Sequence, residues 1–148
     1  MNLEYMEVAF KEAEKAFKRG EVPIGAVIVK NGKIIAKAFN NKEKKHCSIE
    51  HAEITAIKRA SRKLKNWRLE DCDIYVTLEP CPMCASAIKQ SRIKNVYSAL
   101  KNSDINNIDI INRIFNADKV NPKVNFVNNL SVEKSTTLLQ KFFSIRRK

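Results

Sequence analysis

Glycine is scarce in this sequence and is confined to its N-terminal part. The 148 residues include three glycines, Gly20, Gly25 and Gly32, and none follows position 32. An average composition of about 7% glycine would place roughly ten in a chain of this length. Turns beyond Gly32 therefore have to use other residues. We expect Asn, Asp and Ser there, because their short polar side chains bond to the neighbouring backbone.

The sequence also lacks a long apolar run. Its apolar stretches are a handful of residues long, far short of the roughly 20 that a transmembrane helix needs. The first residues, Met1 to Glu4, include an acid and no apolar segment of the kind that directs secretion. We therefore expect no membrane span and a cytoplasmic protein.

Acidic residues are outnumbered by basic ones. Lys and Arg total 28 against 16 Asp and Glu, which gives a formal net charge of +12 at pH 7. The excess is spread along the chain, so no segment forms a separate basic tail. A polyanionic partner explains the excess, and so does a lysine-rich surface that keeps the protein soluble; the charge alone leaves both open.

Hydrophobic periodicity predicts one domain over residues 1–148, in which helices alternate with strands. Asn31-Gly32, between two apolar runs, predicts a hairpin. The predicted helices span 3–18, 50–64, 81–90, 105–116 and 131–145, the predicted strands span 24–29, 33–39, 74–77, 93–97 and 123–127, and 40–49 is a polar loop. Alternation beyond residue 70 indicates parallel pairing beside the hairpin. The pattern predicts an α/β fold with a mixed five-stranded sheet covered by helices.

Two of the four cysteines form a Cys-x-x-Cys pair at a predicted strand-to-helix junction. Cys81 and Cys84 make the pair, whereas Cys47 and Cys72 do not form a second one, as a zinc ribbon would require. A disulfide framework is not expected in the cytosol. The pair by itself is compatible with a redox dithiol, half of a structural zinc site or part of a catalytic metal site.

A histidine and a glutamate upstream favour the catalytic metal site. His51 is one of two histidines in the chain, and Glu53 follows two residues later. His51, Cys81 and Cys84 would supply three ligands and leave a fourth tetrahedral position for water, the arrangement of catalytic zinc. In mid-helix, residues two apart point in nearly opposite directions. His51 must therefore lie at the very start of its helix if Glu53 is to reach the same site.

These residues resemble a known signature. His51-Ala52-Glu53 followed by Pro80-Cys81-Pro82-Met83-Cys84 is similar to the motif of the zinc-dependent nucleoside and nucleobase deaminases. The stretches 21–27, 66–69, 75–81 and 138–147 resemble more closely the bacterial tRNA-specific adenosine deaminases. The similarity covers nearly the whole chain and is weakest over 101–128. It implies a three-layer α/β/α cytidine-deaminase-like fold.

The resemblance also implies a reaction, the conversion of adenosine to inosine at the wobble position of a tRNA anticodon. One Zn²⁺ per subunit, held by His51, Cys81 and Cys84, would lower the pKa of a water molecule. Glu53 would take the proton of that water, deliver it to the purine ring and help to protonate the departing ammonia.

Other residues are implied to bind the substrate. Asn40 would hydrogen-bond the target nucleoside, and Ala26 and Val27 would line the base pocket. Phe142, Arg146 and Arg147 would contact the anticodon loop of the tRNA, because unstacked bases are commonly held by aromatic and Arg side chains. Members of the superfamily commonly dimerise, so a homodimer is expected.

The sequence departs from the family pattern at two places. Glu50 stands before His51, where the family has a small residue. The loop 97–104 lacks the family's Asp-x-Lys-x-Gly pattern, with Lys101 near the usual Asp and no glycine. Because that loop contacts RNA in the family, the reading of substrate is expected to be altered, unless Asp104 compensates through a shift of register.

Two other functions remain open at this point. A small-molecule deaminase of guanine, cytosine or a nucleotide would share the metal ligands but has no need of the +12 charge. An RNA-binding subunit that keeps zinc without catalysis is the non-enzymatic alternative. The presence of Glu53 argues against the subunit.

Overall fold

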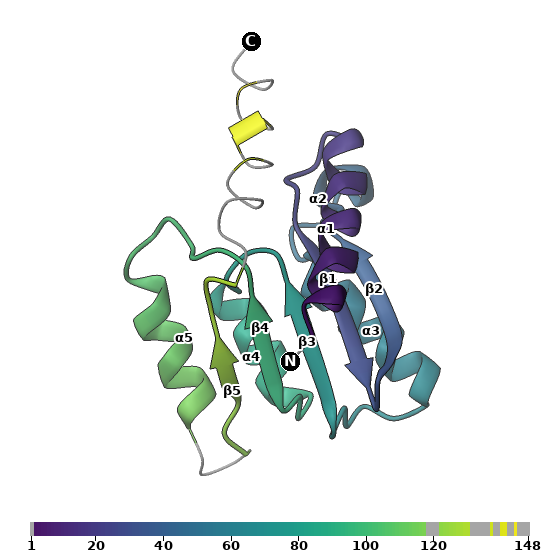
Figure 1. Ribbon diagram of the computed structural model, residues 1–148, viewed down its shortest axis with the longest axis vertical. Coiled ribbons are helices and arrows are strands. Elements are labelled where there is room, and N and C mark those ends of the chain that lie inside the picture. Colours follow the sequence, from purple (N-terminus) through teal and green to yellow (C-terminus); the bar gives the residue numbers. More distant parts are fainter. Residues whose placement is uncertain (1, 118–121, 131–136, 138–139, 142–143, 145–148) are drawn as a thin grey trace.

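The computed structural model describes residues 2–117, 122–130, 137, 140, 141 and 144. Its five-stranded sheet has the order β2-β1-β3-β4-β5 (Figure 1). Strand β1 (Gly25–Lys30) pairs antiparallel with β2 (Lys33–Phe39) and with β3 (Cys72–Val76), whereas β4 (Asn95–Ser98) pairs parallel with β3 and β5 (Asn125–Val127). The predicted mixed sheet and hairpin are confirmed.

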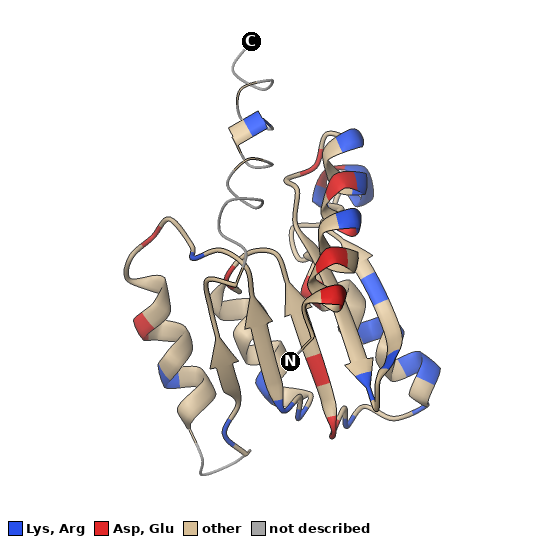
Figure 2. Ribbon diagram, in the orientation of Figure 1, with Lys and Arg blue, Asp and Glu red and all other residues tan. Residues whose placement is uncertain are grey.

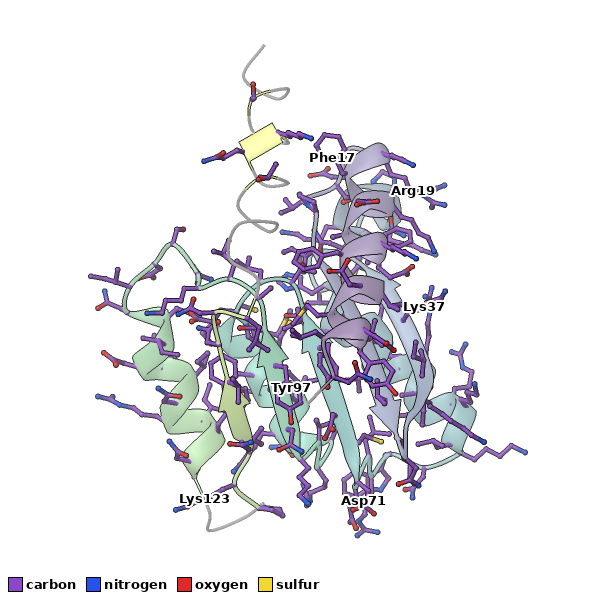
Figure 3. The ribbon with its side chains drawn as sticks, in the orientation of Figure 1. Phe17, Arg19, Lys37, Asp71, Tyr97 and Lys123 are labelled. Carbon is purple, nitrogen blue, oxygen red and sulfur yellow. The ribbon has the colours of Figure 1, made fainter. Side chains whose placement is uncertain are left out.

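Helices cover both faces of this sheet. Helix α1 (Leu3–Lys18) packs on one face, where Met6 and Phe10 contact the side chains of Val27 and Tyr75. The other face is covered by α3 (Ala52–Leu64), α4 (Pro82–Gln90) and α5 (Asn107–Asn116), whose alanine, isoleucine and phenylalanine side chains form the larger core. Tyr97 lies over the middle of the sheet on the α1 side (Figure 3). The expected three layers are present.

The carboxyl ends of strands β2, β3, β4 and β5 all lie at the same end of the sheet (Figure 1). The chain that leaves β2 there forms a short helix, α2 (Lys42–Lys45), before α3 begins, and the chain that leaves β3 leads directly into α4. Helices α3 and α4 therefore start side by side, at the carboxyl ends of the strands, where ligands of open α/β sheets usually bind.

Helix α2 was not predicted, since 40–49 reads as a polar loop. The carboxylate of the buried Glu21 accepts hydrogen bonds from the backbone N–H groups of Glu43 and Lys44, both at 3.0 Å. A carboxylate at a helix N-terminus satisfies unpaired N–H groups and the helix dipole. The short helix therefore depends on a residue 22 positions away from Glu43.

Beyond Gly32, residues other than glycine adopt positive φ, and only some of them are of the types expected. Beyond Gly32, the described residues with positive φ include Asp71 and Asn129, as predicted, but also His46, Lys65 and Arg92. His46 and Lys65 are the C-cap residues of α2 and α3. Long side chains take left-handed conformations there at a cost of about 1–2 kcal/mol each.

The predicted C-terminal helix over 131–145 lies mostly outside the described residues. Of its residues, 137, 140, 141 and 144 are described and are helical. In the described part of the chain, no helix is both long enough and apolar enough to cross a membrane.

Candidate active site

The site forms where α3 and α4 begin. His51 is the N-cap residue of α3, and Cys81 is the N-cap residue of α4, with Cys84 three positions further on. The Nδ1 atom of His51 lies 3.7 Å from the Cys81 sulfur and 3.4 Å from the Cys84 sulfur. The sequence requires His51 to stand at the very start of its helix, and it lies there.

These three side chains fit a tetrahedral metal ion. Their ligand atoms all lie within 4.8 Å of one another. In a tetrahedral zinc site with Zn–N near 2.0 Å and Zn–S near 2.3 Å, nitrogen and sulfur ligands lie about 3.5 Å apart. The observed separations of 3.4 and 3.7 Å match that geometry. One nitrogen and two sulfur donors are ligand types that Zn²⁺ prefers, and a fourth position remains for water.

The pKa values of the two cysteine thiols are shifted in opposite directions. The bond from the Cys84 thiol lowers the pKa of Cys81 to about 4, against the opposing effect of burial. The same bond, together with burial, raises the pKa of Cys84. A hydrogen bond to Cys81 raises the pKa of His51. The lowered pKa favours the thiolate form of Cys81 at the N-terminus of α4, and the thiolate is the form that binds a metal ion.

Glu53 is the second residue of α3, and its side chain turns into the same site. It is 4% exposed, and this burial raises the pKa of its carboxyl to about 7. A carboxyl group whose pKa is close to the working pH both accepts and gives up a proton readily. Glu53 is therefore equipped for proton transfer beside the three metal ligands.

A cavity of about 190 Å³ opens onto this cluster. It is smaller than the roughly 300–1,000 Å³ pockets that enclose drug-sized ligands, so it suits a group the size of one nucleobase. Its lining residues are Ile24, His51, Glu53, Leu78, Glu79, Cys81 and Asn102. A planar heteroaromatic ring held there would lie against both the metal ligands and the Glu53 carboxyl.

Comparison with known proteins places the chain in a family. The MafB19-like deaminase family matches residues 1–147. The tRNA-specific adenosine deaminase of Bacillus subtilis is 42% identical over 144 residues, which is 97% of this chain and 89% of that protein. This chain belongs to the tRNA-specific adenosine deaminases. The Aquifex aeolicus member is 43% identical over 140 residues, 94% of this chain and 91% of that protein.

Solved structures of deaminases share the fold of this chain. A structure described in work on A-to-I editing by tRNA:A34 deaminases superposes with a TM-score of 0.85 at 36% identity, over 93% of this chain and all of that one. A guanine deaminase from Bacillus subtilis superposes with a TM-score of 0.67 at 32% identity, over 100% and 96% of the two chains. The predicted deaminase fold is confirmed.

Of the residues expected to bind substrate, those that the structure describes do not line the cavity. Asn40 is buried at the end of β2, and its backbone N–H donates to the carbonyl of Ile24, 3.0 Å away. Ala26 and Val27 are fully buried in the two opposite cores, because helices cover both faces of β1. Ile24, the residue directly before β1, lines the cavity, whereas Ala26 and Val27 do not. Phe142, Arg146 and Arg147 lie outside the described residues.

The unusual Glu50 points along α3 rather than into the pocket. Its carboxylate accepts a hydrogen bond from the Thr55 hydroxyl at 3.0 Å and pairs with Lys58 at 3.8 Å. A carboxylate beside the first turn of a helix is favourable, because the helix dipole is positive there. This departure from the family pattern therefore places a carboxylate that interacts with the first turns of α3.

Sequence reasoning missed two polar residues of the cavity, Glu79 and Asn102. Glu79 directly precedes Pro80 of the motif, but nothing in the spacing gives it a role. Asn102 lies in the loop that departs from the family pattern, and this departure was its only signal. Glu79 is held by hydrogen bonds from Asn107 and Asn128, which are far from it in the sequence, and no local pattern encodes such contacts.

Proposed function

We propose that this protein deaminates adenosine to inosine at the wobble position of a tRNA anticodon. The observation that supports this most is that the His51, Cys81 and Cys84 cluster and the Glu53 carboxyl lie together, with His51, Cys81 and Glu53 lining one base-sized cavity. In a chain that belongs to the tRNA-specific adenosine deaminases, that arrangement supplies a metal site, a proton carrier and room for one nucleobase. The unit that acts is a single deaminase domain over residues 1–148.

His51, Cys81 and Cys84 would hold one Zn²⁺ per subunit. The ion supplies the means to activate a water molecule at neutral pH. Glu53 accepts a proton from the attacking water and delivers it to N1 of the purine ring. The Glu53 carboxylate then takes the proton of the hydroxyl group now on C6 and passes it to the departing amine, so that adenosine and water give inosine and ammonia with no net proton consumed at the site.

Further residues are assigned to substrate binding on the resemblance to the family. Asn40 hydrogen-bonds the target nucleoside, and Phe142, Arg146 and Arg147 contact the anticodon stem-loop. The protein works in the cytoplasm as a homodimer, since the superfamily that it resembles commonly dimerises.

The test compares substrates for the zinc-loaded protein. An RNA anticodon stem-loop with adenosine at the wobble position should yield inosine, whereas free guanine, free cytosine and free adenosine should be turned over at least a hundredfold less efficiently. Turnover of free guanine or cytosine beside an inert stem-loop would instead assign the protein to the small-molecule deaminases. A zinc-loaded protein inactive on every substrate would contradict an enzymatic role.

A further inference from the structure

The loop between β4 and α5 contributes one residue, Asn102, to the lining of the cavity, and hydrogen bonds hold both of its ends. Asn102, in this loop, lines the cavity together with Glu53 and Glu79. The loop contains no glycine, and in this chain it differs from the family pattern. What fixes Asn102 in place therefore bears on how this particular protein reads its base.

A buried carboxylate ties the loop to the metal-binding segment. Glu79 is 3% exposed, and its two carboxylate oxygens accept hydrogen bonds from the side-chain amides of Asn107 and Asn128, each at 2.7 Å. The backbone N–H of Glu79 donates to the carbonyl of Leu100 at 2.7 Å. We call Glu79, Asn107 and Asn128 the Glu79 network.

The Glu79 network holds both ends of the loop. Asn128 accepts a hydrogen bond from the hydroxyl of Ser98, the last residue of β4. Asn107, the first residue of α5, also donates to the carbonyl of Pro80 at 3.0 Å, directly before the metal ligand Cys81. A buried polar group held by satisfied partners is rigid, because breaking any bond leaves an unpaired group. The loop is therefore fixed relative to Cys81.

Local bonding determines which end of the Asn102 amide is available. Its Oδ1 atom accepts from the backbone N–H of Asp104 at 3.0 Å, and that N–H can only donate, so the bonded atom is the oxygen. Among the described residues, no hydrogen bond occupies the Nδ2 group of Asn102. The loop thus offers the cavity a hydrogen-bond donor.

We infer that Asn102 is a specificity-determining residue that donates from Nδ2 to a ring nitrogen of the target purine, and that the Glu79 network positions it. This inference rests on the proposed deamination of adenosine. N1 of the purine is used by Glu53, so the acceptors that remain on the ring are N3 and N7. A donor at this wall selects a base with an acceptor in the matching position.

Two substitutions at Asn102 distinguish the loss of its Nδ2 donor from the loss of the bond that holds the loop. Asn102→Asp keeps the oxygen that accepts from Asp104 but replaces the donor by a second oxygen. Asn102→Ala removes both ends of the amide. We expect kcat/KM on the adenosine stem-loop to fall about tenfold for Asn102→Ala, the size of one lost hydrogen bond, and further for Asn102→Asp, which repels the acceptor.

Asn106→Asp is the matched control. It makes the same change of charge four residues further on, at an exposed position that does not line the cavity. The zinc content, the Tm and the kcat/KM of this variant should equal those of the unaltered protein. A loss as large as that of Asn102→Asp would mean that only the charge of the loop matters, and would overturn the inference.

The decisive measurement uses stem-loops that carry 7-deazaadenosine or 3-deazaadenosine at the target position. For the unaltered protein, kcat/KM should be about tenfold lower on one of the two analogues than on adenosine. For Asn102→Ala, kcat/KM on that analogue should equal its kcat/KM on adenosine. Equal effects of both analogues on the two proteins would overturn the inference. Inactivity of the unaltered protein on the adenosine stem-loop would contradict the proposed function instead.

Glu79→Gln tests the positioning role. The substitution keeps the shape of Glu79 but places an amide against the amides of Asn107 and Asn128. The measured quantity is the ratio of kcat/KM on adenosine to kcat/KM on the analogue that slows the unaltered protein. Glu79→Gln alone should bring this ratio close to one. Added to Asn102→Ala, Glu79→Gln should leave the ratio unchanged. An equal loss of kcat/KM in both backgrounds would mean that Glu79 has a structural role only.

Discussion

At Gly25 the backbone of helix α1 lies so close to the sheet that no Cβ atom fits between them. A Cβ atom built there would lie 2.0 Å from the carbonyl oxygen of Ala9 and 2.7 Å from the backbone nitrogen of Ala13. Both are backbone atoms, so relief requires a shift of the whole helix. Packing against α1 therefore explains the glycine at position 25. From the sequence, a role was predicted for Gly32 only, in the hairpin turn.

We predict that Gly25→Ala lowers the free energy of unfolding by about 3 kcal/mol, the upper range for overpacking. Gly32→Ala is the control, because Gly32 has a φ of +75° and open space around it. That variant should lose only about 1–2 kcal/mol, the cost of a left-handed alanine. Urea unfolding of the two variants measures both values, and similar losses would show that the close approach is unimportant.

Individual site residues were predictable to different degrees. His51, Glu53, Cys81 and Cys84 follow from residue type and spacing, because metal and proton-transfer chemistry restricts both. Glu79 and Asn102 are ordinary polar residues in sequence, and only the folded chain brings them to the cavity. Ala26 and Val27 were expected in the pocket but are in the cores, since a strand covered on both faces buries both of its alternating positions.

At the scale of elements, long periodic segments were predicted within a few residues. Strand β2 matches its predicted span of 33–39, and α3 begins at Ala52 rather than at 50. Helix α2 was missed because four residues carry no detectable period, and its stability comes from the distant Glu21. Helices this short are not stable by themselves.

The C-terminal end of α5 depends on a buried lysine from α4. Lys89 is 6% exposed, and its ammonium donates to the carbonyls of Phe115, at 3.0 Å, of Ala117, and of Pro122, at 2.8 Å. The last carbonyls of a helix lack partners in the helix, and a cation there also interacts favourably with the dipole.

We predict that Lys89→Met lowers the free energy of unfolding by about 3 kcal/mol, because it leaves these carbonyls without their charged donor. Lys94→Met, at an exposed position shortly after α4, should change it by less than about 0.5 kcal/mol. Thermal and urea unfolding of the two variants make the comparison. Equal stabilities would show that water replaces the ammonium.

At the scale of the whole molecule, the +12 charge is distributed over many elements. Figure 2 shows basic residues along β2, α2 and α3, and both acidic and basic residues on α1. The positive charge is therefore not gathered into one patch in this view, and in the proposed complex with tRNA the cations next to bound phosphates would contribute most to affinity.

We predict that Arg146→Ala with Arg147→Ala weakens binding of the anticodon stem-loop. The slope of log K against log[salt] should fall by about 0.7–0.9 for each phosphate that the protein no longer neutralises. The control pairs Lys11→Ala with Lys63→Ala, two exposed lysines. Lys63 lies about 18 Å along α3 from His51, at 1.5 Å per residue. Fluorescence anisotropy at several salt concentrations gives the slopes. Equal losses of affinity in the two pairs would show that the charge acts only in bulk.

Inosine formation by Glu53→Gln tests the proposed mechanism at its centre. The zinc-loaded unaltered protein should convert the wobble adenosine of an anticodon stem-loop to inosine. Glu53→Gln should bind one zinc per subunit and the same stem-loop, yet form inosine at least a thousandfold more slowly, because it cannot carry the proton. An undiminished rate in this variant, with its zinc bound, would contradict the central role of Glu53 and the mechanism built on it.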